Sequence, residues 1–497
     1  MSKASSSSVL LVSFAALLVG CSGGMTSPNQ PISPNMVQAS LTMHDNPPMG
    51  VTVLSFDIDV TGAELQPSDS SKPAVPMLSE PEDIELEHLQ TESALLASRS
   101  VPTGAYSSLM VSFANPHMTI QNQTPNTLML GSQSCLTQQI CEFDPKLNPS
   151  SVTLQGSPFP ITLTMNSPLV LKMDFNVDAS VQQNDLSITP MVSVVQVPTT
   201  NSNGQQDEED VEVVGTITSI SQTTGLQTFM IQSGMNGPSY NIATGSNTQF
   251  DFGTSCSTAD FSCLRVGQIV AVEAKMQPDG SLLAFKVKLF QPPNQISFAG
   301  TITSISSSGT STSFQIVLFD EEAFGGEMGS MSMGSPLTIN LDMSTTFSID
   351  NRGFMLPPGL SFAVPADLMV GQKVRLHPTG LPSGMPPNLT VTVDQVQLEP
   401  SDVTGTVTSI SPGSSPPNFT LGMLPAFFQN AKITSIQVDV LSNTRFETEE
   451  DRMVAGLGSL NTGNTVSVRG LLFNTMPTPT MVAEKVVNRS MSSGTSD

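Results

Sequence analysis

The chain has 497 residues, more than one globular core normally holds, so we expect two to four domains. Its 18 Lys and Arg residues stand against 42 Asp and Glu residues, which gives a formal net charge of -24. This balance argues against binding to nucleic acid or to anionic membrane surfaces, because both depend on clustered cations. The common helix formers are depleted relative to β-branched and turn residues, so the folded parts are predicted to be mostly β.

The N-terminus has the pattern of a secretory signal. Lys3 precedes an apolar run, residues 9–19, which is too short to cross a bilayer as a mature helix. The end of this run resembles the lipobox of bacterial lipoproteins, with the sequence Leu18-Val19-Gly20-Cys21.

The resemblance implies cleavage before Cys21 and attachment of acyl chains to its thiol. Two or three acyl chains anchor a protein stably, since each buried methylene adds about 0.8 kcal/mol. Ser22 stands where an Asp would retain some lipoproteins at the inner membrane, which favours the outer membrane. An ordinary signal peptide followed by a chance cysteine is the alternative.

Composition and internal similarity divide the chain into eight segments. These are a lipoprotein signal peptide (1–20), a flexible tether (21–36), an N-terminal β-sandwich (37–200), an acidic linker (201–212), three β-repeats (213–291, 296–400 and 402–490) and a disordered tail (491–497).

The N-terminal domain is predicted to be an antiparallel sandwich. Short apolar strands are expected at 51–60, 109–113, 161–165, 169–177 and 191–197, without the alternation of strands and helices that a parallel sheet needs.

Residues 95–106 resemble the L-L-x-x-x-x-x-P-x-G-x-Y turn of another uncharacterised domain of bacterial lipoproteins, with 51–67 as the upstream partner. The resemblance implies that the Tyr106 ring covers the end of the core while its hydroxyl bonds the backbone. Residues 82–97 could instead form a short helix, since Ile84, Leu86 and Leu89 follow several acids.

A threefold repeat fills the second half. The copies open with VGTITSIS at 214–221, AGTITSIS at 299–306 and TGTVTSIS at 404–411. Each copy later has a glycine followed by a strand with an apolar period of two, and about five strands in all, which suits a small barrel or OB-like fold.

The second copy carries an insertion, 320–335, expected to be a surface loop, and each copy is expected to have its own core. These motifs, over about 211–490, resemble a repeat of unknown function found in secreted and lipid-anchored bacterial proteins. The resemblance implies no reaction.

Four cysteines besides Cys21 form two pairs close in sequence, Cys135 with Cys141 and Cys256 with Cys263. After export each pair can close a small disulfide loop. Metal binding is the alternative, but the spacings do not match zinc knuckles and no histidine lies near either pair.

Candidate chemistry is sparse. No nucleophile elbow or phosphate-binding loop is present, and His44, His88, His117 and His377 lack partners at metal-ligand spacing. We therefore assign no catalytic, cofactor-binding or metal-ligating residue. Met328, Met331 and Met333 could bind Cu(I) through soft thioethers, while the acidic stretches 207–210 and 320–322 lack the calcium-loop pattern.

We predict a non-enzymatic, lipid-anchored envelope protein that serves as a structural or binding scaffold for protein or glycan partners. Serial modules on a tether would extend its reach and allow multivalent binding. A carbohydrate-binding or processing protein is the alternative, with Cu(I) binding as a further one; the lack of Trp and the presence of only 2 Tyr weaken the carbohydrate hypothesis.

Overall fold

Nearly every regular element of the chain is a β-strand, which confirms the predicted fold class. The computed structural model describes residues 35–46, 53–78, 80–87, 89–91, 93–131, 133–165, 167–182, 185–197, 209–223, 226–233, 238–252, 256, 258–277, 281–289, 297–308, 311–322, 333–350, 356–384, 388–448 and 453–490.

The first sheet of the N-terminal sandwich is mixed. Its strands run in the order β13 (Val192–Gln196), β12 (Leu169–Asn176), β1 (Met36–Asn46) and β5 (Ser93–Pro102). We expected antiparallel pairing only, but β1 and β12 are parallel over eight residue pairs, from Ala39 with Leu169 to Asn46 with Asn176. The strand before β12, β11 (Ile161–Leu163), pairs with β6 (Gly104–Gln121) of the opposite sheet, so β12 reaches β1 through a crossover between the sheets, and a crossover rather than a hairpin is what parallel neighbours need.

The second sheet is built on two long paired strands, β2 (Val53–Pro67) and β6 (Gly104–Gln121). Shorter strands extend it: β3 (Val75–Pro76), β4 (Glu82–Glu85), β9 (Ile140–Phe143), β10 (Ser151–Leu154) and β11 (Ile161–Leu163). The rings of Phe56 and Phe113 each meet Phe175 of the first sheet edge to face, with centroids 5.7 and 5.5 Å apart. These contacts bring the apolar faces of both sheets into one core.

Two small elements complete the sandwich. A two-stranded hairpin joins β7 (Leu128–Leu130) to β8 (Gln133–Cys135), and a single helical turn, α1 (Val177–Ser180), follows β12.

The turn between β5 and β6 has the predicted form. The Tyr106 hydroxyl donates to the Pro102 carbonyl at 2.8 Å, its ring is buried, and Gly104 has a positive φ of 151°. The alternative helix over 82–97 is wrong: these residues form β4, a turn and the start of β5, and Ile84 and Leu96 point into the core of the sandwich.

Each of the three repeats folds into a five-stranded barrel with the same strand order. Barrel 1 contains β14 (Glu209–Thr223), β15 (Leu226–Gln232), β16 (Ser239–Asp251), β17 (Ile269–Met276) and β18 (Leu282–Leu289); barrel 2 contains β19 (Ser297–Ser308), β20 (Ser311–Glu322), β21 (Pro336–Ile349), β22 (Lys373–Pro378) and β23 (Leu389–Glu399); barrel 3 contains β24 (Ser401–Ser411), β25 (Asn418–Gly422), β26 (Ile436–Thr448), β27 (Thr465–Phe473) and β28 (Thr480–Asn488). In each barrel the third and fifth strands are parallel and all other pairs are antiparallel.

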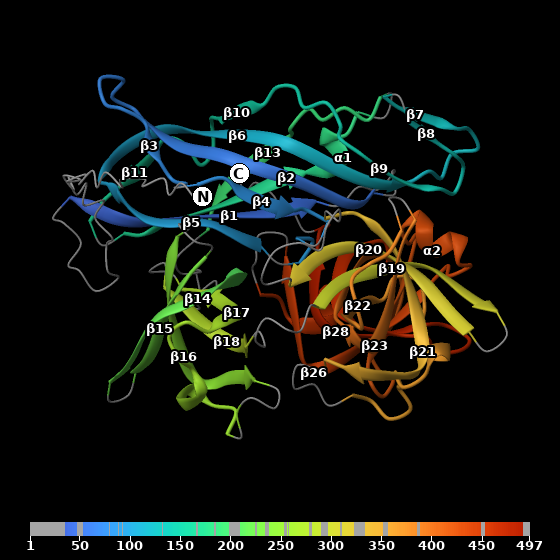
Figure 1. The fold of residues 1–497 in the computed structure, drawn as a ribbon. Coiled ribbons are helices and arrows are strands. Elements are labelled where there is room, and N and C mark those ends of the chain that lie inside the picture. Colours follow the sequence, from blue (N-terminus) through green and yellow to red (C-terminus); the bar gives the residue numbers. More distant parts are fainter. Residues whose placement is uncertain are drawn as a thin grey trace, which may run out of the picture.

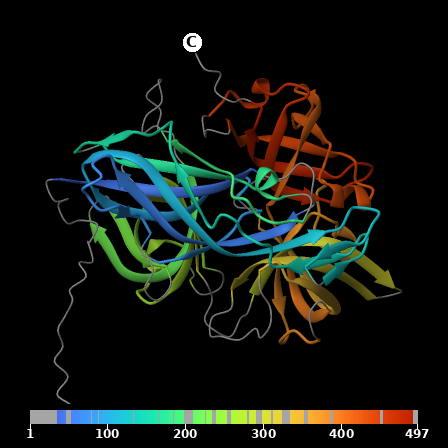
Figure 2. The same ribbon diagram turned by 90° about the horizontal axis from the view of Figure 1, so that it is seen from above.

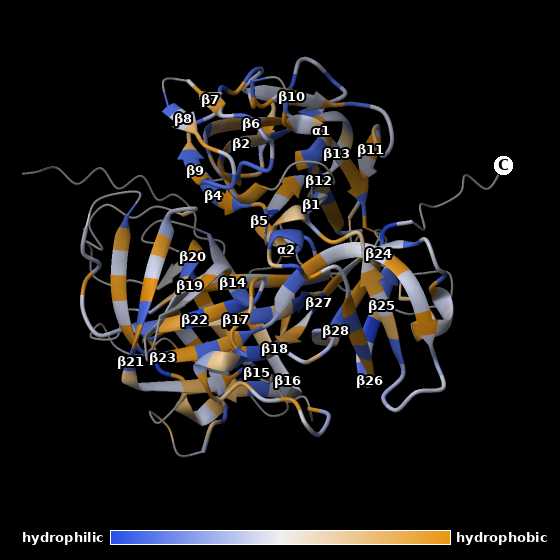
Figure 3. Cartoon of the chain, turned by 90° about the vertical axis from the view of Figure 1, so that its right-hand side faces the viewer, coloured by the Kyte–Doolittle hydropathy of each residue, from blue (hydrophilic) through white to orange (hydrophobic). Residues whose placement is uncertain are grey.

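The repeated opening motif contains a glycine that the close approach of the second strand requires. A Cβ added to Gly215 would lie 2.5 Å from the Gln232 carbonyl oxygen, and one added to Gly300 would lie 2.6 Å from the Ile316 side chain. Along the strands of each barrel, apolar side chains alternate with polar ones and fill the interior (Figure 3).

The insertion in the second repeat is not a simple surface loop. Asp320–Glu322 end strand β20, and at the other end Gly334 and Ser335 are buried against the sandwich. The Thr119 hydroxyl donates to the Gly334 carbonyl at 2.7 Å, and the Ser335 hydroxyl donates to Glu142 Oε1 at 3.0 Å. Polar groups on the outer face of the sandwich therefore hold the end of this insertion.

Each repeat has a core cluster of its own, as expected, and the four modules also pack against one another. Strand β14 continues the first sheet of the sandwich by pairing in parallel with β5, and Lys286 of barrel 1 contacts Asp350 of barrel 2 at 2.9 Å. Figures 1 and 3 show all three barrels on one side of the sandwich. Figure 2 shows barrel 1 near one end of it and barrels 2 and 3 near the other.

Barrels 2 and 3 also share apolar core. Leu471, Phe473 and Val482 of barrel 3 pack with the core of barrel 2, while Met369 of barrel 2 packs with the core of barrel 3. The two barrels therefore bury surface that either would expose alone.

We expect Phe473→Ala to destabilise barrels 2 and 3 together by about 3–5 kcal/mol, because the ring is 1% exposed and lies in the shared core. Urea unfolding followed by a probe in each barrel measures this. The control Met476→Ala, at a side chain 87% exposed, should change stability by less than about 0.5 kcal/mol. A lower unfolding free energy for barrel 3 alone, with barrel 2 unchanged, would contradict the shared core.

Candidate functional site

A cavity of about 320 Å³ lies where the sandwich, barrel 2 and barrel 3 meet. We call it the junction cavity. Its walls are Val53, Leu54, Glu87 and Gln90 from the sandwich, Thr301, Gly371 and Lys373 from barrel 2, and residues of the stretches 401–406 and 423–429 from barrel 3. The volume is at the lower end of the range for small-molecule sites. Since three modules supply the walls, none of them forms the cavity alone.

Glu87 is the one carboxyl of this cavity that lacks an ionic partner among the described residues. The residue is 9% exposed; its Oε2 accepts from Gln90 Nε2 at 3.4 Å, and its Oε1 has no hydrogen-bond partner in the described part of the chain. Burial raises the pKa of Glu87 well above its usual range, and the neighbouring carboxylates of Asp45 and Glu85 raise it further.

A buried polar network ties the Glu87 segment to barrel 3. The Thr404 hydroxyl donates to Gln90 Oε1 at 2.8 Å, and Arg489 Nη2 donates to the carbonyl oxygens of Gln90 and Asp45 at 2.7 and 3.2 Å. In the same network, the Thr91 hydroxyl donates a hydrogen bond to Asp402.

Asp402 has a second, ionic partner. Arg469 Nη1 lies 3.2 Å from Asp402 Oδ2, and both side chains are 3% exposed. The Asp402 carboxylate is thus paired, in contrast to Glu87.

The opposite wall is apolar. The helix α2 (Ala426–Asn430) places Phe427 and Phe428 with stacked rings, 4.4 Å between centroids. Phe428 is buried against Gly371, where an added Cβ would collide with its ring, so only glycine allows this contact. Phe427 remains half-buried and lines the cavity.

A second cavity, of about 720 Å³, borders the first at Phe427. Its polar lining consists of Gln121, Thr303, Ser304, Asn430, Lys432, Thr434, Ser435, Asn474, Thr475 and Thr478. Lys432 is the one charged residue in that lining, although the chain carries a net charge of -24. The connection 474–479 between β27 and β28 forms one side.

A separate ionisable cluster lies on the outer face of the sandwich. His117 Nδ1 is 2.7 Å from Asp144 Oδ1, and its Nε2 is 3.1 Å from Glu142 Oε1. The hydrogen bond with Glu142, with a further one to Asp144, raises the pKa of His117 to about 9. On the neighbouring strand Asp57 pairs in register with His117, and burial followed by a hydrogen bond with Asp83 raises its pKa to about 8.

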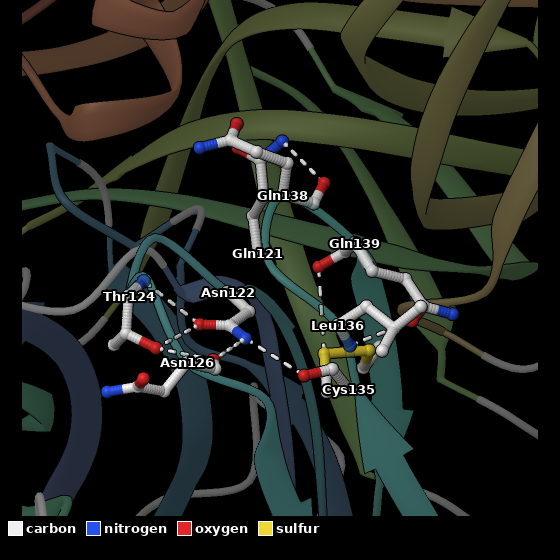
Figure 4. Close-up of a disulfide and its surroundings, with 9 residues drawn as sticks. Gln121, Asn122, Thr124, Asn126, Cys135, Leu136, Gln138 and Gln139 are labelled. Carbon is white, nitrogen blue, oxygen red and sulfur yellow. Dashed lines mark hydrogen bonds between the residues drawn. A yellow bond between two sulfur atoms is a disulfide. The ribbon is translucent and has the colours of Figure 1, made fainter.

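The predicted cysteine pairs lie at disulfide distance. Their Cα atoms are 5.9 Å apart for Cys135 and Cys141, and 6.1 Å apart for Cys256 and Cys263. Figure 4 shows how Asn122 holds the first loop, since its Nδ2 donates to the Cys135 carbonyl at 2.9 Å while its Oδ1 accepts from the Thr124 hydroxyl at 2.8 Å.

Several candidate residues lie outside the described part of the chain: Cys21, His88, Met328 and Met331, together with residues 207 and 208. Met333 is half-buried at the end of the insertion. Within the described residues, no group of three or more His, Cys, Asp or Glu side chains is arranged to hold a metal ion.

The other two histidines in the described part of the chain, His44 and His377, lie in different modules. His44 is buried in β1 with Nε2 3.8 Å from Asp174 Oδ1, and burial, then Lys172, lowers its pKa well below the usual value. His377 Nδ1 lies 2.6 Å from Asp394 Oδ1 in barrel 2.

Glu87, its cavity and the His117 cluster were missed by sequence reasoning. Asp57 and His117 share a register position on adjacent strands, whereas Gln90, which lines the cavity with Glu87, bonds Thr404, 314 positions away. The sequence carries no local signal for a contact between residues so far apart in the chain.

Comparison with known proteins finds two domains of unknown function. One, DUF4382, matches residues 37–190, and the other, DUF5666, matches residues 214–288. No curated protein matches the sequence.

One matching solved structure is a deletion mutant of the single-stranded DNA binding protein from Thermus aquaticus. It is 11% identical, the match covers 41% of this chain and 97% of that one, and the TM-score of 0.15 is too low to carry an argument. None of the helices in the described residues is long and apolar enough to cross a bilayer.

Folding raises the pKa of His117, so its protonation stabilises the fold below the ordinary value of about 6.5. This contribution is lost as the pH rises through about 9. We expect Glu142→Gln to lower the His117 pKa, because it removes the stronger of the two carboxylate partners, and NMR titration of the imidazole measures it.

Asp185→Asn, which removes an exposed carboxylate elsewhere in the sandwich, is the matched control and should leave the titration unchanged. An unaltered His117 pKa in the Glu142 variant would show that this contact does not hold the proton.

Proposed function

We propose that the chain is an exported, lipid-anchored envelope protein that acts as a binding scaffold rather than as an enzyme. The junction cavity is the observation that supports this most, because three modules pack together to enclose it and its walls combine a buried carboxyl, hydroxyls and aromatic carbon. A ligand or a partner's side chain seated there would touch all three modules at once.

The evidence for the lipid anchor comes from the sequence. The run Leu18-Val19-Gly20-Cys21 follows an apolar segment of signal-peptide length, and residues 21–36 have the composition of a tether. The two cysteine pairs at disulfide distance agree with an oxidising compartment outside the cytoplasm. Ser22 favours placement at the outer membrane.

Cys21→Ser should abolish lipid attachment. We expect the wild-type chain to show a lipid mass increment and to stay with the envelope fraction, and the variant to lose both, as measured by intact mass and by fractionation. Ser22→Ala keeps the thiol and should behave as the wild type. An unmodified wild-type chain in the soluble fraction would make the protein secreted and remove the anchor from this proposal.

Carbohydrate binding is a second candidate function, and the second cavity favours it. Hydroxyl and amide side chains line most of its polar surface, and Phe427 offers an aromatic face. The connection between the fourth and fifth barrel strands, 474–479, borders it, and the corresponding loops of OB-type barrels bind oligosaccharides. A neutral glycan matches a lining that lacks carboxylates.

On a glycan array, this second candidate predicts reproducible binding that Phe427→Ala weakens by about tenfold, since the sugar would lose its stacking face. Met453→Ala, which alters an exposed side chain elsewhere on barrel 3, is the control and should bind normally. No binding to any glycan would leave protein partners as the ligands of the scaffold.

A further inference from the structure

We propose that the junction cavity binds a small organic cation, whose ammonium group pairs with Glu87 while its carbon atoms lie against Phe427. The proposal rests on the binding-scaffold function and names the class of ligand that its junction cavity would take. It does not depend on the lipid anchor.

The unpartnered oxygen of Glu87 is the first argument. Glu87 lines the cavity and is 9% exposed, and its Oε1 is buried without a hydrogen-bond partner in the described part of the chain. Buried carboxyl oxygens are normally satisfied, so an unsatisfied one on a residue that lines a cavity points to a donor that enters through that cavity.

The charges around Glu87 indicate the sign of the ligand. Two carboxyls, Asp45 of β1 and Glu85 of β4, face it from the sandwich. The cations nearby each have partners: Arg489 bonds the carbonyls of Asp45 and Gln90, Arg469 pairs with Asp402, and Lys373 Nζ lies 4.1 Å from the centre of the Phe319 ring. A cationic ligand would give Glu87 the ionic partner that it lacks among the described residues. An anionic ligand would add to the negative charge of the neighbouring carboxyls.

The apolar wall fits the rest of such a ligand. Phe427 presents an aromatic ring, which attracts a cation through its electron-rich face, and Met423 and Leu424 add carbon surface beside it. A cavity of about 320 Å³ holds a compact ammonium compound rather than a long chain.

Binding also has a proton balance. Glu87 must be ionised to pair with an ammonium group, so the complex forms as the carboxyl releases its proton to solvent. Raising the pH therefore strengthens binding. The carboxyls that act on Glu87 are Asp45 and Glu85. The other charged groups around the cavity are Lys373, the paired Asp402 and the arginines Arg469 and Arg489, which stay protonated.

The test is calorimetric titration of the purified full chain, in a non-ionic detergent, with tert-butylammonium chloride at pH 6 and pH 8. We expect saturable binding that is tighter at pH 8. Glu87→Gln keeps the side-chain size and should weaken binding about tenfold or more, since a neutral amide replaces the ionic partner. Glu80→Gln, at an exposed acid just before β4, should bind as the wild type does.

Phe427→Ala provides a second variant, because its half-buried side chain can be truncated with less risk to the fold than Glu87 carries; it should weaken binding several-fold. The neutral, similarly shaped tert-butanol should not bind. Equal binding of tert-butanol, unchanged affinity in Glu87→Gln, or no binding of tert-butylammonium at either pH would overturn the inference. The lipid mass of the same preparation reports on the anchor separately.

Discussion

The arrangement of the molecule depends on the buried polar network between residues 86–91 of the sandwich and barrel 3. Arg489 bonds two sandwich carbonyls, and Thr91 bonds the same Asp402 that pairs with Arg469. Charged groups at 3% exposure are stable only when each has its partner, since removal of one leaves the other buried and unpaired. The need to keep these buried groups paired fixes the position of barrel 3 on the sandwich.

The junction cavity follows from that placement. Once barrel 3 is fixed, its helix α2 is held against Gly371 of barrel 2, and the end of the barrel 2 insertion is held at Thr119 of the sandwich. The three bodies meet without filling the space between Glu87 and Phe427. A carboxyl that a simple surface loop would expose to water is thereby enclosed, with its pKa raised.

Local signals in the sequence predicted much of the fold. The glycine and apolar periodicity of each repeat specify strands and turns a few residues apart, and the Pro102 to Tyr106 turn is a contact over four residues. The parallel pairing of β1 with β12, the shared core at Phe473 and the position of Glu87 depend on which surfaces meet, and periodicity shows only that a face is buried. The hydrogen bond from Thr91 to Asp402 spans 311 positions, which no local pattern encodes.

Small-angle X-ray scattering of the monomeric chain tests most directly whether the modules form one body. A packed chain of this length has a radius of gyration of about 23 Å, with some increase for the terminal segments. The account predicts a value close to this and a distance distribution with one maximum. A clearly larger radius, with a distribution that shows separated modules, would contradict the packed arrangement and the junction cavity with it.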